Sequence, residues 1–253
     1  IEIRRHCNDC TINFFTEVIL GYFFEFTKDH CCDFWWSVFI IANTDFHKII
    51  VASMNAAFDA QNYPKPDAEA VRRVVGLPLH VAMERLRPDA DPDVYKQLAN
   101  SYIEAFQHLR EKGEVTDPLY PGVMDILSVL EDAGWILGIA TGKGRRGLLA
   151  TLETHGLVDR FQTLQTSDSA PGKPNPGMLL NAMGETGADP TGTAMIGDTT
   201  FDMEMALAAG TMAVGVSWGY HPEEHLHKAG AHVVIDNFAA LPGELKCLGG
   251  APP

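Results

Sequence analysis

The stretch AMIGDTTFDMEMA, residues 194–206, decides the fold because it joins a strand to a helix through two acidic residues. Apolar residues up to Ile196 predict a buried strand, a glycine permits a tight turn, and a helix follows. Asp198 and Asp202 lie four residues apart at this junction. Two carboxylates so close repel each other unless a cation lies between them, and oxygen ligands of this type suit Mg²⁺. Alternatively, both acids only cap the helix.

The same alternation of strand and helix extends over residues 119–243. Helices with short links separate the strands, which we expect over 135–141, 161–168, 193–199, 211–219 and 231–236. Strict alternation of this kind predicts a parallel sheet that is covered by helices on both faces. The predicted fold class is therefore α/β, with a Rossmann-like sheet.

Residues 47–113 show apolar residues at helical spacing and no strand pattern. Asp91 is the expected N-cap of the last of four helices, which cover 47–61, 65–76, 77–86 and 91–113. Upstream, the stretch SVFIIANTDFHKII, residues 37–50, predicts a buried strand that ends in a loop before the first helix. In an α/β enzyme, such a strand end is a usual position for catalytic groups.

Two further strand ends carry polar residues. Thr141 and Gly142 follow a buried strand, where a hydroxyl and backbone N–H groups at a helix start can bind phosphate. The alternative for this turn is a plain helix cap. Lys173 lies on a loop that Pro171 and Pro174 stiffen, so the lysine is either held in a fixed place or part of a surface turn.

Taken together, a Thr after one strand, a Lys after the next and GDxxxD after a third resemble motifs II, III and IV of the haloacid dehalogenase-like hydrolases. The nearest likeness is to the phosphoglycolate phosphatase-like branch of that family. Its members insert an all-helical cap domain after the first strand, which matches residues 47–113. The resemblance covers approximately residues 47–243.

The resemblance implies a Mg²⁺-dependent phosphohydrolase that acts on small phosphate monoesters through an aspartyl-phosphate. Thr141 and the Gly142 amide would bind the transferring phosphoryl group, and Lys173 would neutralise its charge. Asp198 would hold Mg²⁺ directly. Asp202 would hold Mg²⁺ through water or orient Lys173. These roles agree with the chemistry of phosphoryl transfer, which needs alignment and charge stabilisation.

The sequence departs from the family at motif I, DxDGT, whose first Asp is the nucleophile. An ungapped match of the first helix places the motif on Val38 to Ala42, which contain no carboxylate. Asp45 then matches a later, non-nucleophilic position. Alternatively, Asp45 and His47 imitate the paired acids. Two other functions stay open: a catalytically impaired phosphate-binding protein, and a phosphosugar mutase of the same fold.

Composition also changes near residue 46. Residues 1–46 hold 11 of the 23 aromatic residues, so we expect an atypical N-terminal segment that includes the first core strand. The helical cap region would then cover 47–118, with its first helix partly in the core. The α/β core would cover 119–243 and a tail would cover 244–253.

The net charge of −14 argues against a nucleic-acid partner, because binding to phosphate backbones takes clustered Lys and Arg. No apolar run is long enough to span a membrane, so we expect no membrane partner. The expected protein is cytoplasmic, a monomer or homodimer, and binds a small phosphorylated metabolite. An anionic ligand would need a local cation, which Mg²⁺ and Lys173 would supply.

Cysteine and histidine clusters offer two weaker metal hypotheses. Four of the five cysteines precede residue 33, and Cys7 with Cys10 could join a zinc site; free thiols are the alternative that we prefer. His221, His225 and His227 could suggest a second metal, although a solvated loop and helix start is the preferred interpretation.

Trp218, Gly219 and Tyr220 follow a strand end and are expected to border the active site.

Overall fold

The computed structural model describes residues 35–38, 44–115 and 119–248, with side chains from residue 47 onward. The predicted α/β class is confirmed. The described part of the chain forms one parallel six-stranded sheet in the order β3-β2-β1-β4-β5-β6. The strands are β1 (Trp35–Val38), β2 (Ile136–Thr141), β3 (Thr163–Thr166), β4 (Thr193–Gly197), β5 (Met212–Val216) and β6 (Val233–Ile235).

This strand order contains a switch point between β1 and β4. The chain builds outward from β1 through β2 and β3, then returns to the other side of β1 for β4, β5 and β6. Val38, the last residue of β1, pairs with Ile196 of β4. Ligands of open α/β sheets bind beyond the carboxyl ends of the strands at such a point, so the topology marks the place to search for a site.

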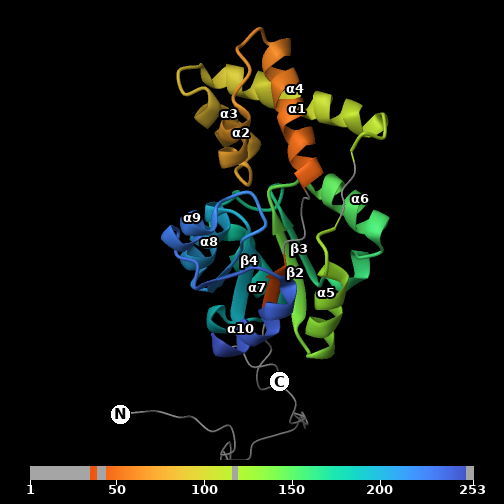
Figure 1. Cartoon of the computed structure of the whole chain (residues 1–253), viewed down its shortest axis with the longest axis vertical. Helices are drawn as coiled ribbons and strands as arrows, with labels where there is room; N and C mark the ends of the chain where they lie inside the picture. The colour runs from red at the N-terminus through yellow and green to blue at the C-terminus, as the bar shows by residue number, and fades with distance from the viewer. Residues whose placement is uncertain (1–34, 39–43, 116–118, 249–253) are drawn as a thin grey trace, which may run out of the picture. The chain divides into compact units, whose positions relative to one another are not determined.

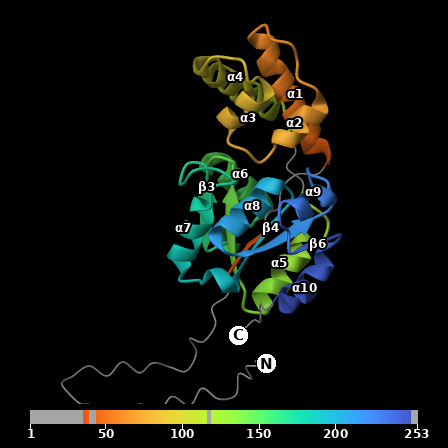
Figure 2. The ribbon, with the colours of Figure 1, turned by 90° about the vertical axis from the view of Figure 1, so that its left-hand side faces the viewer.

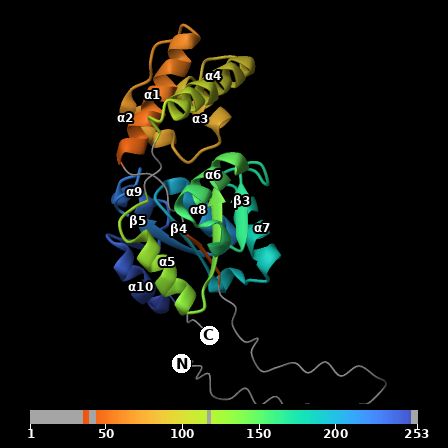
Figure 3. The same ribbon diagram turned by 90° about the vertical axis from the view of Figure 1, so that its right-hand side faces the viewer.

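Helices cover both faces of the sheet, as the strand–helix alternation predicts. One face carries α5 (Val123–Asp132), α6 (Arg145–His155) and α10 (Leu241–Cys247), and the other α7 (Gly177–Thr186), α8 (Thr200–Ala209) and α9 (Glu223–Lys228). Figures 2 and 3 show α7 on one side of the sheet and α5 with α10 on the other. Strand residues alternate between the two apolar cores: Ala194 and Ile196 face one, and Met195 faces the other.

Residues 47–113 contain four helices and no strand, as predicted. They are α1 (Thr44–Ala60), α2 (Ala68–Val74), α3 (Leu79–Leu86) and α4 (Pro92–Glu111), which form one group in Figure 1. α1 packs along α4, and the two share an apolar core with α2 and α3. Asp91 occupies the N-cap position of α4 as expected, although its side chain makes no capping hydrogen bond. We call α1–α4 the cap.

Two boundaries differ from the sequence expectation. The region expected as a tail, 244–253, begins inside α10, where Leu241 and Leu245 are fully buried. Leucines four residues apart lie on one face of a helix, so this turn packs onto the sheet instead of trailing from it. The first cap helix starts at Thr44, three residues before the expected start at His47.

None of the helices in the described residues combines the length and apolar character needed to cross a bilayer. The expected roles of the cysteines before residue 33 lie outside the described residues, and Cys247 is an exposed free thiol.

Candidate active site

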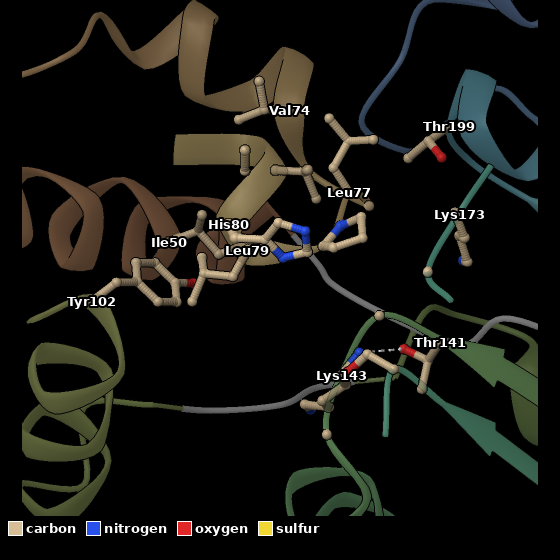
Figure 4. Close-up of a pocket in the computed structure, with 18 of the residues that line it drawn as sticks. Ile50, Val74, Leu77, Leu79, His80, Tyr102, Thr141, Lys143, Lys173 and Thr199 are labelled. Atoms are coloured by element: carbon tan, nitrogen blue, oxygen red, sulfur yellow. Dashed lines mark hydrogen bonds between the residues drawn. The ribbon is translucent and has the colours of Figure 1, made fainter. Parts of the chain in front are cut away.

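The carboxyl ends of three strands bring the predicted site residues together. Thr141 is the last residue of β2, Lys173 lies in the loop after β3, and Asp198 directly follows β4. All three line one cavity of about 710 Å³, together with Gly142 and Asp202. Figure 4 shows Thr141 and Lys173 on the core side of this cavity. The structure thus gathers around one space the five residues that the resemblance assigned to phosphate and Mg²⁺ binding.

Lys173 and Asp202 form a buried ion pair. The Lys173 Nζ lies 2.5 Å from Asp202 Oδ1, and the two side chains are 6% and 1% exposed. A buried ammonium is unfavourable without a partner, so Asp202 is what allows the lysine to remain charged in the cavity wall. The proline-rich loop therefore holds Lys173 in a fixed place, and the surface-turn alternative is wrong because the side chain is buried.

The other oxygen of Asp202 caps α8. Asp202 Oδ2 accepts hydrogen bonds from the Thr199 backbone N–H at 3.0 Å and from the Thr199 hydroxyl at 2.7 Å. The Thr199 hydroxyl in turn accepts from the Asp202 N–H at 3.3 Å, which completes a capping box. Both carboxylate oxygens are engaged, so in this structure Asp202 caps the helix and orients Lys173. Asp202 was expected either to hold Mg²⁺ through water or to orient Lys173, and these contacts fit the second role.

A glycine makes this arrangement possible. A Cβ atom on Gly197 would lie 2.3 Å from the Cβ of Asp202, closer than two such atoms approach in proteins. The sequence predicted a tight turn at this glycine. The absence of a side chain there allows the first turn of α8 to pack against the end of β4.

Asp198 does not cap the helix, unlike Asp202. Its Oδ2 accepts the Tyr220 backbone N–H at 3.0 Å, and its backbone carbonyl accepts the His221 N–H at 3.1 Å. Burial and the nearby Asp202 carboxylate raise the pKa of Asp198 to about 7. A cation beside Asp198 would restore the ionised form.

Thr141 does not cap α6, whose N-cap is Gly144. Its side chain is buried, and its Oγ1 accepts the Lys143 backbone N–H at 3.1 Å, which forms a local turn before α6. The hydroxyl proton remains a donor for a ligand oxygen, because a hydroxyl both donates and accepts.

The cap contributes contacts that the sequence did not reveal. Arg72 of α2 donates from Nε to the Tyr220 carbonyl at 2.6 Å and from Nη2 to the Gly219 carbonyl at 3.0 Å. Both acceptors are backbone carbonyls, 147 and 148 residues away from Arg72 in the sequence. Every residue has such a carbonyl, so the sequence could not indicate which ones Arg72 would bind. Tyr220 lines the cavity as expected, whereas Trp218 packs on Phe238 in the core with ring centroids 4.8 Å apart.

Residues 76–78, between α2 and α3, form what we call the closing segment. The Gly76 carbonyl lies 3.5 Å from the position of a Cβ on Gly142, and Pro78 would lie 2.4 Å from a Cβ on Gly172. Gly76 itself has φ +99°, and a Cβ there would lie 3.1 Å from the Thr199 hydroxyl. The segment thus contacts all three loops of the core that carry site residues.

The strand that precedes motif I, β1, lies between β2 and β4. β1 ends at Val38, whose partner Ile196 precedes Asp198 by two residues. Residues 39–43 lie outside the described residues, and their sequence, FIIAN, contains no carboxylate. The alternative in which Asp45 and His47 imitate the paired acids is wrong: both lie in α1, and residues two apart on a helix do not share a face.

The histidines after β5 do not gather around a metal. Among the described residues, no group of three His, Cys, Asp or Glu side chains could hold an ion. His225 and His227 are solvated and lie near Glu224 and Glu223. His221 differs from the expectation of a solvated residue: it is 5% exposed, and its Nδ1 accepts the Thr200 backbone N–H at 3.0 Å.

The buried ion pair predicts a large stability cost for Asp202→Asn. The amide can still accept the Thr199 N–H, but it leaves Lys173 buried without a counter-charge, so we expect a loss of about 3–5 kcal/mol in the free energy of unfolding. Urea unfolding would measure it. Glu224→Gln, which removes the exposed pair with Lys228, is the control and should leave stability nearly unchanged because solvent screens that pair. Equal costs for the two variants would contradict the assignment.

The buried His221 predicts a stability loss in acid. Burial lowers the pKa of His221 from its ordinary value of 6.5, so the folded state binds the proton less readily than the unfolded state. Its stability contribution is therefore complete above pH 6.5 and is lost as the pH falls through the lowered folded-state pKa. His221→Asn, which retains an acceptor for Thr200, should show a smaller drop in Tm on acidification than the wild type. His225→Asn should follow the wild type; identical pH profiles for both variants would refute the prediction.

Known proteins share both the sequence pattern and the fold. The model of the haloacid dehalogenase-like hydrolases matches residues 40–216. The chain is 34% identical over 200 residues to the "Probable phosphatase IndB" of Dickeya dadantii strain 3937, covering 79% of this chain and 87% of that protein. It is 29% identical over 201 residues to a phosphoglycolate phosphatase of Mesorhizobium japonicum, covering 78% and 87%. The fold matches that of a hydrolase from Pseudomonas syringae with a TM-score of 0.72, 24% identity, and coverage of 85% of this chain and 98% of that one. The chain therefore belongs to the haloacid dehalogenase-like hydrolase family.

Proposed function

We propose that this site binds the phosphoryl group of a small phosphate monoester and supports its hydrolysis. One observation carries the proposal: a buried lysine, a strand-end hydroxyl and an acidic residue converge on one cavity at the switch point of the sheet. The names of the relatives, which include several phosphatases, support the same class of reaction.

The chain's own residues supply orientation and charge. The Thr141 hydroxyl and the Gly142 N–H donate to phosphoryl oxygens, and the Lys173 ammonium offsets their negative charge. Charge stabilisation of this kind is the main requirement of phosphoryl transfer. In a protein of net charge −14, a buried lysine at this point provides the local positive charge that an anionic substrate needs.

We further propose Mg²⁺ as the cofactor. Asp198 fits the ion because burial and Asp202 raise its pKa, so a divalent cation beside it relieves the repulsion. Mg²⁺ is usually held by one or two carboxylates, water and substrate phosphate oxygens, which suits a site whose other acid is already engaged by Lys173. When bound, the ion would neutralise charge on the phosphoryl group.

The nucleophile is the part of the family's chemistry that this chain lacks. The aspartyl-phosphate route needs a carboxylate at the end of β1, and residues 38–43 contain none. This observation favours a second candidate function, a phosphate-binding protein with little or no turnover. A phosphosugar mutase needs the same carboxylates, so their absence does not favour that function. In a protease stripped of its catalytic groups, binding and charge stabilisation alone leave about 10³–10⁴-fold acceleration over water, so we expect weak hydrolysis.

The hydrolysis of p-nitrophenyl phosphate with MgCl₂ tests the proposal. We expect slow turnover that Lys173→Ala abolishes and that the exposed control Lys228→Ala retains, because Lys173 is a buried lysine of the cavity wall whereas Lys228 lies outside the cavity. A wild-type rate equal to that of Lys173→Ala would reject hydrolysis. Retained binding of inorganic phosphate in that case would favour the second candidate.

A gain-of-function variant adds a stricter control. Val38→Asp with Ile40→Asp restores both acids at the positions where the family carries them. Because loss of a nucleophile costs on the order of 10⁶-fold in one protease, the variant should hydrolyse the ester far faster than the wild type. Asn43→Asp is the control, because together with the natural Asp45 it creates the same pair of acids at another position. It should hydrolyse the ester no faster than the wild type.

Calorimetric titration with MgCl₂ tests the cofactor without relying on activity. We expect Mg²⁺ to bind the wild type more tightly when inorganic phosphate is present, because phosphate oxygens complete the coordination. Asp198→Asn should weaken Mg²⁺ binding by about tenfold or more, since it removes the anionic ligand. Glu204→Gln, an exposed acid on α8, serves as the control. Equal Mg²⁺ affinities of Asp198→Asn and the wild type would overturn this assignment.

A further inference from the structure

We infer that the organic group of the substrate is uncharged and largely apolar, such as an aryl or branched alkyl group. This inference rests on the proposed function, because it assumes that a phosphoryl group occupies the polar half of the cavity. It extends that function by naming the class of ester, which the core residues do not specify.

The cavity has two chemically different halves. The core half carries the polar groups of Thr141, Lys173 and Asp198, and also Lys143, whose Nζ donates to Thr151 Oγ1 at 2.8 Å. The cap half is built almost entirely from hydrocarbon side chains of α1, α2, α3 and α4, chiefly Ile50, Met54, Val74, Leu79, Tyr102 and Phe106. Figure 4 shows Ile50, Leu79 and Tyr102 across the cavity from Thr141. A phosphate held on the core side therefore directs its ester group toward an apolar wall.

Charged groups of the cap point elsewhere. Besides the Tyr102 hydroxyl, the only ionisable cavity-lining side chain in the described part of the cap is His80. The nearby arginines have other partners: Arg72 binds the carbonyls of Gly219 and Tyr220, Arg85 lies 5.2 Å from the Phe201 ring centroid, and Arg87 lies 4.0 Å from that of Tyr63. None of the three lines the cavity. A carboxylate on the leaving group would find no arginine there to pair with it.

The aromatic part of the wall consists of two uncharged rings, and the Arg110 guanidinium, which does not line the cavity, lies 5.5 Å from the Phe106 ring centroid. Tyr102 and Phe106 stack with ring centroids 6.1 Å apart and an angle of 23° between the rings. Burial raises the pKa of Tyr102, so its hydroxyl remains uncharged at neutral pH. A flat apolar group can pack on such rings, and each buried methylene contributes to affinity by leaving water. A cavity of about 710 Å³ accommodates a group of this size beside the phosphoryl group.

Two non-hydrolysable phosphonates separate this inference from the proposed turnover. Benzylphosphonate carries an apolar group, and 3-phosphonopropionate carries a carboxylate. Calorimetric titration with MgCl₂ should show benzylphosphonate binding at least about tenfold more tightly to the wild type, because only its ring buries apolar area against the cap. Equal affinities, or tighter binding of 3-phosphonopropionate, would overturn the inference while leaving the phosphate site intact.

Ile103→Arg tests whether the cap wall sets this preference. Ile103 lines the cavity from α4 and is 44% exposed, so the variant should fold. A guanidinium there should shrink the preference for benzylphosphonate by about threefold or more, because it can pair with the carboxylate of the competitor. Leu180→Arg, at a position 50% exposed on α7 and outside the cavity, is the matched control and should leave the preference unchanged. An unchanged preference in Ile103→Arg would also reject the inference. Failure of both phosphonates and inorganic phosphate to bind would instead reject the phosphate site itself, and the inference with it.

Discussion

The contact between the Lys173 ammonium and the Asp202 carboxylate is the interaction on which the rest of the site depends. Neither group tolerates burial alone, and the two come from different elements: Lys173 from the loop after β3 and Asp202 from the first turn of α8. Asp202 is fixed by the capping box at the start of α8, and that start requires a glycine at the end of β4. The beginning of one helix therefore determines where the positive charge of the cavity lies.

The order of the strands determines which strand ends lie next to one another in the site. β1 lies between β2 and β4, so Val38, its last residue, lies between the strand ends that carry Thr141 and Asp198. The cavity-lining residues that match the family's motifs II, III and IV follow β2, β3 and β4. The sequence differs from the family's motif I after β1, where residues 38–43 contain no carboxylate.

Much of the fold and part of the site could be predicted from the sequence, for reasons that the structure makes plain. Alternating strands and helices predicted the parallel sheet, and the carboxyl ends of parallel strands meet at one edge, which brought Thr141, Lys173 and Asp198 together. Contacts across long separations left no local pattern: Arg72 binds backbone carbonyls, whose identity no sequence reveals. The buried state of His221 and the packing of α10 depended on tertiary contacts in the same way. The choice between two roles for Asp202 also needed coordinates.

The closing segment, residues 76–78, has a consequence for the exchange of parts between relatives. The Pro78 ring would lie 2.4 Å from a Cβ on Gly172, so a side chain there would collide with it, and a Cβ on Gly76 would lie 3.1 Å from the Thr199 hydroxyl. A chimera that joined this core to a cap from another family member would have to match these small residues as well as the linkers. A change of side chain on one side of this contact therefore constrains which residues fit on the other side.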